Sequence, residues 1–291
     1  MDITLTARQP FSLTAVIRSH GWVQLLPFES DENYSHFKTI LELKSGRVVQ
    51  VGVSEAPGGA QATIHSEVAP EEAAEIEQAL HWMLDTDRDM SSFYEHARGE
   101  PRLAGAEANH RGRILRCPTV FEDVVKTILT TNTAWSGTRR MVRGLVEKYG
   151  APLPGDSQRR AFPSASRLAA ADVESLRQEC KLGYRAPYVL ELAQKQASGE
   201  IDLEACKTDH LPTPELRKQL LALKGVGDYA AANLLMLLGR YDYIPVDSWA
   251  LSMVSREWYN GAPITRKEVE AAFEAWGEWR GLAFWLWEWK T

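Results

Sequence analysis

Cysteine is scarce in this sequence. The 291 residues contain only three, Cys117, Cys180 and Cys206, and they lie far apart. They therefore match neither the close spacing of a metal site nor a disulfide framework, which suits a reducing cell interior. The chain also has no apolar run of membrane-spanning length and no signal-peptide pattern at its N-terminus. These absences predict a protein that is not secreted and has no membrane partner.

Positive charge is not in excess either. The net charge is −6, which at first sight argues against a polyanionic partner. The charge is uneven, however: residues 1–110 hold 8 basic and 17 acidic side chains, and the remainder holds 25 and 22. A phosphate-binding patch is a local property, so the whole-chain charge does not exclude a basic face in the second part. A scattered, solvated surface is the alternative. The candidates for that face are Arg111, Arg113, Arg116, Arg139, Arg140, Arg143, Lys148, Lys181 and Arg185.

The first hundred residues carry β-strand patterns. Apolar residues alternate over 37–43 and again over 49–53, with Ser45-Gly46 as a turn between the two runs. Residues 60–65 have the composition of another strand, and residues 70–84 form an amphipathic helical pattern that opens on a proline. We therefore expect an antiparallel sheet accompanied by a helix in this part of the chain.

A Gly-Val-Gly turn, Leu223-Lys224-Gly225-Val226-Gly227, lies between two apolar helical patterns. Residues 215–223 have apolar side chains at helical spacing, and residues 229–238 are rich in Ala and Leu. The two glycines let the chain turn tightly and leave the first backbone N–H groups of the next helix open. Such groups bind anions at the positive end of the helix dipole. An ordinary helix–helix turn is the alternative, because so short a motif is not specific.

An isolated aspartate, Asp247, follows the second helical pattern. Gly239 can end that helix, and Pro245 biases Ile244 towards an extended conformation. Asp247 then stands where a helix over residues 248–258 should begin. The residue suits a helix N-cap, and it equally suits a carboxylate that stabilises a cation. One side chain can do both.

Together these features resemble the helix-hairpin-helix/Gly-Pro-Asp (HhH-GPD) superfamily of DNA glycosylases, which includes 3-methyladenine and 8-oxoguanine DNA glycosylases. Residues 223–227 match the family's hairpin, and Val246-Asp247 matches the aspartate in its name. The likeness continues in order through residues 117–150, 182–189 and 276–287. It implies an α+β fold: an N-terminal antiparallel β-sheet domain with helices over residues 1–107, and a mainly α-helical catalytic region over residues 108–291.

The resemblance implies an enzyme of base excision repair that flips a damaged base out of DNA and hydrolyses its N-glycosidic bond. Asp247 would stabilise the positive charge that builds on the sugar. Tyr229 occupies the position of the lysine with which bifunctional members form a Schiff base, so we expect no AP-lyase activity. Asn132, Tyr184 and Arg185 would fill the gap in the DNA and contact the estranged base. From residue type alone, a helix cap and an ordinary helix start remain open for these three.

The polar substrate readers of the 8-oxoguanine enzymes are replaced. Trp249 and Phe284 stand where those enzymes have a histidine and a glutamine, and Gly137 replaces an arginine. A pocket of Trp249, Phe284 and Trp285 would favour stacking and cation–π contact with a positively charged base. We therefore expect alkylated purines such as 3-methyladenine or 7-methylguanine. An oxidised-purine or mismatch glycosylase is the alternative within the class, and a non-catalytic DNA-structure-binding protein is the alternative outside it.

The resemblance implies no required cofactor. The four clustered C-terminal cysteines of the endonuclease III branch are absent, which predicts no iron–sulfur cluster. Family hairpins often hold a monovalent cation, and the backbone carbonyls of Leu221, Leu223 and Val226 would be the matching ligands of a structural Na⁺ or K⁺. The expected partner is double-stranded DNA containing a damaged base. We expect a monomer that acts in the cytoplasm or nucleoid, or in the nucleus of a eukaryote.

Overall fold

The computed structural model describes residues 1–287 and divides into two compact units. Unit 1 contains residues 1–89 and 109–205, and unit 2 contains residues 90–108 together with the chain from residue 206 onward. Each unit therefore draws on two separate stretches of the chain. The sequence predicted a boundary between two folding domains at residues 107 and 108, and that boundary stays a prediction.

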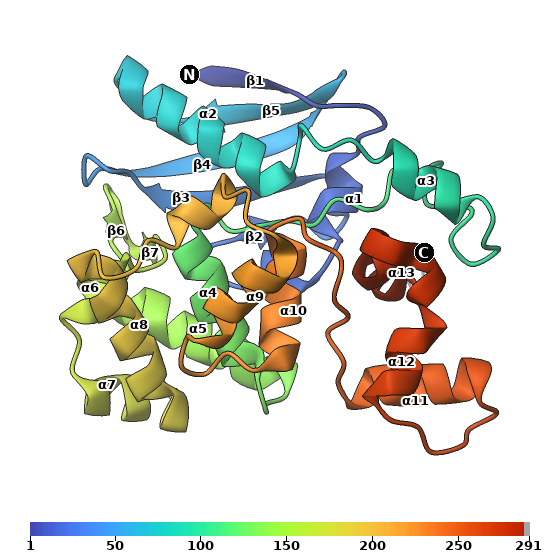
Figure 1. Cartoon of the computed structure of the whole chain (residues 1–291). Coiled ribbons are helices and arrows are strands. Elements are labelled where there is room, and N and C mark those ends of the chain that lie inside the picture. Colours follow the sequence, from blue (N-terminus) through green and yellow to red (C-terminus); the bar gives the residue numbers. More distant parts are fainter. Residues whose placement is uncertain (288–291) are drawn as a thin grey trace. The chain divides into compact units, whose positions relative to one another are not determined.

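A five-stranded antiparallel sheet forms one layer of unit 1 (Figure 1). Its strands, in spatial order, are β1 (Asp2–Thr6), β5 (Gly59–Ile64), β4 (Val48–Ala56), β3 (His36–Glu42) and β2 (Glu29–Ser30). The three strands expected from alternation are β3, β4 and β5, so that prediction is confirmed. Strands β1 and β2 were not anticipated, although Ile3 and Leu5 alternate in β1 and both are buried.

The β3–β4 hairpin shows how the alternating pattern sets the register. Phe37 lies opposite Val53, and Leu41 lies opposite Val49, so the buried side chains of both strands share one face. The turn depends on Gly46, whose φ is +83°, and the Gly46 N–H donates to the Leu43 carbonyl at 2.8 Å. The apolar faces of helix and sheet can then be buried together. Helix α2 (Pro70–Leu84) buries Ile76, Leu80, Met83 and Leu84 and lies across the sheet in Figure 1.

Helices make up most of the rest of both units, which confirms the α+β class. In unit 1 they are α1 (Leu13–Ile17), the short 3-10 turn η1 (Gly21–Gln24), α4 (Val120–Thr130), α5 (Trp135–Tyr149), α6 (Ala165–Ala169), α7 (Val173–Gln178), η2 (Gly183–Arg185) and α8 (Ala186–Ser198), with a small hairpin of β6 (Pro152–Leu153) and β7 (Asp156–Arg160). The turn η3 (Glu204–Lys207) follows at the passage to unit 2. Unit 2 contains α3 (Ser91–Ala97), α9 (Thr213–Leu221), α10 (Asp228–Leu237), α11 (Ser248–Trp258), α12 (Arg266–Ala272), η4 (Glu274–Trp279) and α13 (Arg280–Leu286).

Helix α4 is buried along nearly its whole length and carries a charged cluster into the core of unit 1. Lys126 is fully buried and forms an ion pair with Glu122 at 2.6 Å. One turn away, the Asp123 carboxylate accepts the indole N–H of Trp22 at 2.7 Å and the backbone N–H of Cys117 at 3.1 Å. Burial raises the pKa of Asp123 to about 7. The cluster therefore ties α4 to the N-terminal part of the same unit.

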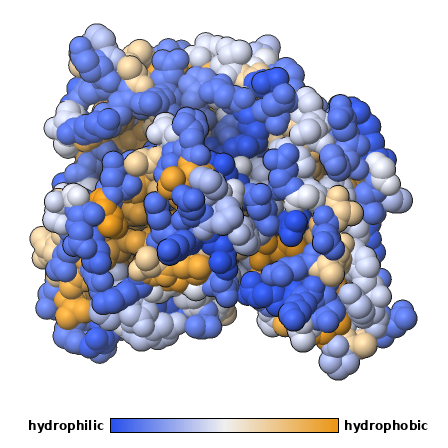
Figure 2. Space-filling model, viewed as in Figure 1, coloured by the Kyte–Doolittle hydropathy of each residue, from blue (hydrophilic) through white to orange (hydrophobic). Residues whose placement is uncertain are grey.

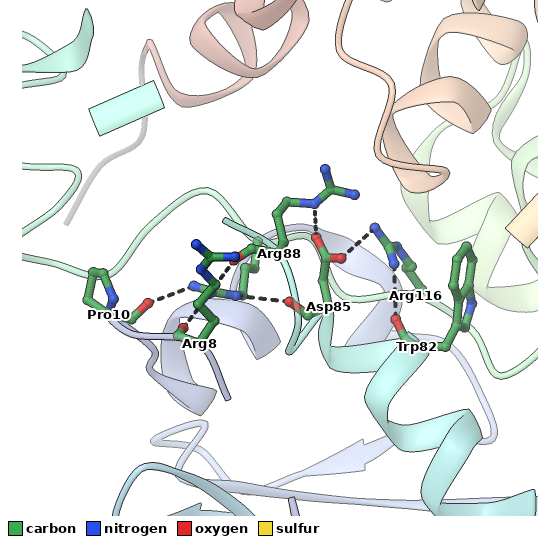
Figure 3. A network of polar contacts seen from close by, with 7 residues as sticks. Arg8, Pro10, Trp82, Asp85, Arg88 and Arg116 are labelled. Carbon is green, nitrogen blue, oxygen red and sulfur yellow. Dashed lines mark hydrogen bonds and ion pairs between the residues drawn. The ribbon is translucent and has the colours of Figure 1, made fainter. Parts of the chain in front are cut away.

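Two arginines expected on a basic face instead hold unit 1 together (Figure 3). Arg116 forms an ion pair with Asp85 at 3.0 Å and lies 4.2 Å from the Trp82 ring centre. Arg113 donates to the backbone carbonyls of Asp85 at 3.0 Å and Pro10 at 2.6 Å. Both residues are buried: Arg113 is 2% exposed and Arg116 is 3% exposed. The prediction that Arg113 and Arg116 face DNA is wrong, because their guanidinium groups are enclosed and used within the unit.

No helix in the described part of the chain is long and apolar enough to cross a membrane. On the face drawn in Figure 2, hydrophobic atoms form separate patches among hydrophilic side chains.

Candidate functional site

The hairpin in unit 2 forms as the sequence predicts. Helices α9 and α10 are joined by residues 222–227, and Gly225 adopts a φ of +87°, which favours glycine. The Val226 N–H donates to the Leu223 carbonyl at 3.1 Å, and the Val226 side chain is buried, so the turn is anchored. Gly227 is the N-cap of α10 and makes no side-chain capping bond. A Cβ at Gly227 would meet nothing within 4 Å, so the space beside the N-cap is open.

An acidic residue that sequence reasoning missed begins α10. Asp228 is exposed and forms an ion pair with Arg217 of α9, while Arg266 of α12 lies 4.0 Å away. The Arg217 guanidinium also lies 4.9 Å from the Tyr243 ring centre. An unpaired carboxylate here would repel an anion at the helix N-terminus, and the Arg217 ion pair offsets that charge. The pairing joins residues of two helices, so only the folded hairpin reveals it.

The three carbonyls predicted to bind a cation lie at the end of α9 and in the turn. Leu221 is the last residue of α9, and the Leu223 carbonyl already accepts the Val226 N–H. Lys224 is exposed beside them. The cation itself stays a prediction.

Asp247 caps helix α11. Its Oδ1 accepts the Ala250 N–H at 2.8 Å, and the side chain is exposed. The capping bond fixes the carboxylate in one orientation, so the N-cap interpretation is confirmed and leaves a second oxygen for chemistry. The preceding helix ends as predicted at Gly239, with φ +76°, where the Arg240 N–H donates to the Leu235 carbonyl at 2.8 Å.

Helix α13 approaches the segment that leads to Asp247 very closely. The Gly281 N–H donates to the Tyr241 carbonyl at 2.7 Å. A Cβ at Gly281 would lie 2.5 Å from the Tyr243 carbonyl oxygen, so any larger residue would push this segment away. Gly281 therefore lets α13 pack against the segment that precedes Asp247, and the sequence carries no signal for this contact.

Tyr229 lies within electrostatic reach of Asp247 in unit 2. Burial raises the pKa of the Tyr229 phenol, and the negative charge of Asp247 raises it further. On the same helix, the Asn233 side-chain amide donates to the Tyr229 carbonyl at 3.0 Å. The residue at the predicted lysine position is therefore a neutral, protonated phenol next to the aspartate.

Two of the three predicted pocket aromatics are in contact. Trp249, two residues after Asp247, is 46% exposed and meets Phe284 edge-on, with ring centres 5.6 Å apart. Phe284 is buried and packs at 5.7 Å against Phe273. Trp285 is half-buried on α13 beside Phe284. Trp249 thus presents an aromatic surface, while Phe284 supports it from the core.

The three residues predicted to fill the gap in the DNA, here called the wedge, come together in unit 1. Asn132, in the junction between α4 and α5, has a φ of +47°, and its amide donates to the Tyr184 hydroxyl at 3.3 Å. Tyr184 is 51% exposed, whereas the next residue, Arg185, is buried. The Arg185 guanidinium donates to the Asn132 carbonyl at 3.2 Å and also to the Thr131 carbonyl.

Two helices joined by a glycine hairpin and followed by an aspartate-capped helix define a helix-hairpin-helix protein. Comparison with known proteins places the chain more narrowly. Residues 125–278, more than half of the chain, match the HhH-GPD superfamily base excision DNA repair proteins, and the chain belongs to this family.

The relatives that it resembles fall into two groups. The chain is 26% identical over 222 residues to a DNA-3-methyladenine glycosylase of Bacillus subtilis, covering 73% of this chain and 71% of the relative. Its fold matches a 3-methyladenine DNA-glycosylase from Archaeoglobus fulgidus with a TM-score of 0.77 and 22% identity, over 99% and 97% of the two chains. It also matches a Clostridium acetobutylicum 8-oxoguanine glycosylase/lyase, solved with DNA, with a TM-score of 0.72 and 22% identity over 95% and 90%.

Proposed function

We propose that this protein is a monofunctional DNA glycosylase that releases alkylated purines from double-stranded DNA. The observation that carries the proposal is the pairing of Asp247, held by its capping bond to Ala250, with a nearby tyrosine instead of a lysine. Phosphate gripping by the hairpin does not need an oriented carboxylate at the start of α11. Asp247 therefore favours an enzyme over a protein that only binds DNA.

The reaction follows from the chemistry of the N-glycosidic bond. As the bond from C1′ to the base nitrogen breaks, its electron pair leaves with the base and positive charge builds on the sugar. The Asp247 carboxylate stabilises that charge, and it accepts the proton of the water that adds to C1′. The products are the free base and an abasic site. A base that is already positively charged leaves easily, so one carboxylate is sufficient.

The absence of lyase activity follows from Tyr229. A lyase step needs an amine that forms a Schiff base with the sugar, and a phenol cannot form one. The raised pKa of Tyr229 keeps the group protonated, so it is not a nucleophile at neutral pH. Lys224, the nearby amine, belongs to the exposed hairpin, where we assign it to the phosphate backbone.

The preference for alkylated purines rests on aromatic surface and on lost polar readers. The exposed Trp249 ring, supported by Phe284, suits stacking on a cationic base. In unit 1, Gly137 is buried, and a Cβ there would lie 2.3 Å from the Thr133 hydroxyl oxygen. A larger residue at 137 would require the Thr133 side chain to shift, and the glycine leaves the chain without that reader of the 8-oxoguanine enzymes.

DNA would be held by two features in separate units. The open N-terminus of α10 and its hairpin would bind the phosphate backbone, and Asn132 with Tyr184 would replace the flipped nucleotide in the stack. Double-stranded DNA with a damaged base is the partner, and we propose that one chain suffices. The Na⁺ or K⁺ at the hairpin carbonyls belongs to the same proposal.

The test is a base-release assay on duplexes that contain 3-methyladenine, 7-methylguanine, hypoxanthine or 8-oxoguanine. We expect release of the methylated purines, with strand breaks only after heat or alkali. Asp247→Asn should bind the same duplexes normally and release base about a thousandfold more slowly. No release from any duplex would contradict the enzymatic proposal. Faster release of 8-oxoguanine would favour the oxidised-purine alternative, and a complex trapped by borohydride would contradict the monofunctional one.

A further inference from the structure

Arg185 lies beside the wedge but is turned inward. The residue is only 7% exposed, whereas its neighbour Tyr184 is 51% exposed. Its guanidinium donates to the carbonyls of Thr131 and Asn132, the latter at 3.2 Å, and lies 4.5 Å from the Tyr184 ring centre. Its Nε is buried as well. One terminal nitrogen therefore binds two backbone carbonyls and Nε is enclosed, so this guanidinium is used within unit 1.

These contacts support the part of the chain that projects. Asn132 adopts the left-handed conformation, with φ +47°, which asparagine tolerates better than most residues with a side chain. Charge-assisted hydrogen bonds to the carbonyls of residues 131 and 132 hold that turn in place. The same guanidinium lies against the Tyr184 ring, which also meets Tyr188 edge-on at 6.2 Å. Arg185 thus braces both projecting side chains at once.

The two projecting side chains are joined to each other. The Asn132 amide nitrogen already donates to the Tyr184 hydroxyl at 3.3 Å. The Tyr184 ring offers stacking, and every base has a face on which an aromatic ring can stack. Strong base discrimination in DNA usually comes from a free guanidinium or amide that pairs with a base edge through two hydrogen bonds. The Arg185 guanidinium is used within unit 1, and the Asn132 amide already shares one donor with Tyr184.

We propose that Arg185 is a positioning residue, and that the enzyme accepts its lesion opposite any of the four bases because the guanidinium that could distinguish them is used within unit 1. The proposal rests on the proposed glycosylase function. It differs from the role expected from the sequence, in which Arg185 itself contacts the estranged base.

The test has a rate arm and a binding arm, each with the lesion opposite C, T, A and G. Single-turnover release of 7-methylguanine gives the rates. Binding of duplexes with a tetrahydrofuran abasic analogue gives affinities that need no chemistry. For the unmodified protein we expect rates and affinities within about threefold across the four bases. A preference of tenfold or more for one base would overturn the proposal.

Arg185→Met separates bracing from base reading. We expect the substitution to lower all four rates and affinities by the same factor, about tenfold, and to leave their ratios within twofold. Arg177→Met is the matched control, because Arg177 lies in the same unit, is paired with Glu174 and has no contact with the wedge among the described residues. The control should leave rates and affinities unchanged. A change in the ratios, or no effect of Arg185→Met, would contradict the bracing role.

Two further comparisons keep the outcome decisive. If Arg185→Met does not fold, judged by circular dichroism and thermal melting, Tyr184→Ala tests the same claim on an exposed residue and should weaken binding equally opposite all four bases. If the unmodified protein binds the analogue duplexes without base preference but releases no base, the glycosylase proposal fails and the claim about Arg185 stands. If it releases base with a strong preference for one opposite base, the glycosylase proposal stands and the claim about Arg185 fails.

Discussion

Asp247 has an observed role as a helix cap and a proposed role in catalysis, and the two can be separated experimentally. The side chain caps α11 through the Ala250 N–H at 2.8 Å and, in the proposed mechanism, stabilises the charge on the sugar. Tyr229 supplies the contrast: in the proposed mechanism this phenol offers no amine for a lyase step, so hydrolysis is the expected chemistry. Arg185 is of a residue type that suits contact with DNA bases, but its side chain is buried and forms its hydrogen bonds inside the protein.

At the residue scale, Asn and Ala at residue 247 should have different effects on stability. Asparagine is as good an N-cap as aspartate, so Asp247→Asn should leave the free energy of unfolding within about 0.5 kcal/mol of the original value. Asp247→Ala removes the cap and should cost about 1 kcal/mol. Urea unfolding measures both, and the base-release assay should show both variants slowed by about a thousandfold. An Asp247→Asn variant that retained most of its activity would contradict the catalytic role.

At the element scale, the two glycines of the hairpin differ in backbone geometry and in surroundings. Gly225 is needed for its positive φ, whereas Gly227 has ordinary extended geometry at the start of α10 and open space beside it. The two glycines therefore serve different purposes, one for the turn and one for access to the backbone N–H groups. Gly281 of α13 serves a third, since it permits contact with the carbonyls of Tyr241 and Tyr243.

Substitutions of the two hairpin glycines should separate these purposes. Gly225→Ala should reduce the free energy of unfolding by about 1 kcal/mol, because alanine is strained at positive φ. Gly227→Ser should not destabilise the protein, because serine is a favoured N-cap, but its hydroxyl would occupy the N–H groups that we assign to phosphate. We therefore expect weaker DNA binding from Gly227→Ser without loss of stability. Urea unfolding and fluorescence anisotropy with a labelled duplex check both results, and unchanged affinity would argue against a phosphate site.

At the scale of the whole molecule, some basic side chains are buried within the fold and others lie on the surface. Arg113, Arg116 and Lys126 are buried with their partners, and they hold unit 1 together instead of facing a ligand. Of the nine basic candidates, the exposed ones on α5 are Arg139, Arg140, Arg143 and Lys148, and Lys148 is paired with Glu179. These follow the wedge turn in the chain, so the basic surface expected for DNA is smaller than the sequence suggests.

The buried Asp123 predicts a pH dependence of stability. Its pKa is about 7 in the folded protein and about 4 in the unfolded chain, so the folded state binds the proton more tightly. This contribution is fully present below pH 4 and is lost as the pH rises through 7, on the order of 4 kcal/mol at most. The partly buried His20, with its pKa lowered to about 4, acts in the opposite direction between pH 4 and 6.5.

The comparison with Asp123→Asn isolates the Asp123 effect, because His20 is present in both proteins. Asparagine keeps the acceptor for the Trp22 indole and does not titrate. Relative to this variant, the unmodified protein should lose stability steadily from pH 4 to pH 7, as measured by urea unfolding at several pH values. Parallel curves for the two proteins would show that the carboxyl is ionised throughout this range.

The sequence alone determined those features that depend on local patterns. Alternation in residues 37–43 and 49–53 specifies strands that bury one face, and the positive φ at Gly225, the end of α10 at Gly239 and the cap at Asp247 follow from backbone preferences of single residues. The tertiary structure alone decided what depends on distant residues. It paired Arg217 with Asp228, enclosed Arg113, Arg116 and Arg185, and brought Tyr229 near Asp247. The physical reason is that burial and charge pairing depend on which surfaces meet in the fold, and residue type and spacing along the chain do not specify that.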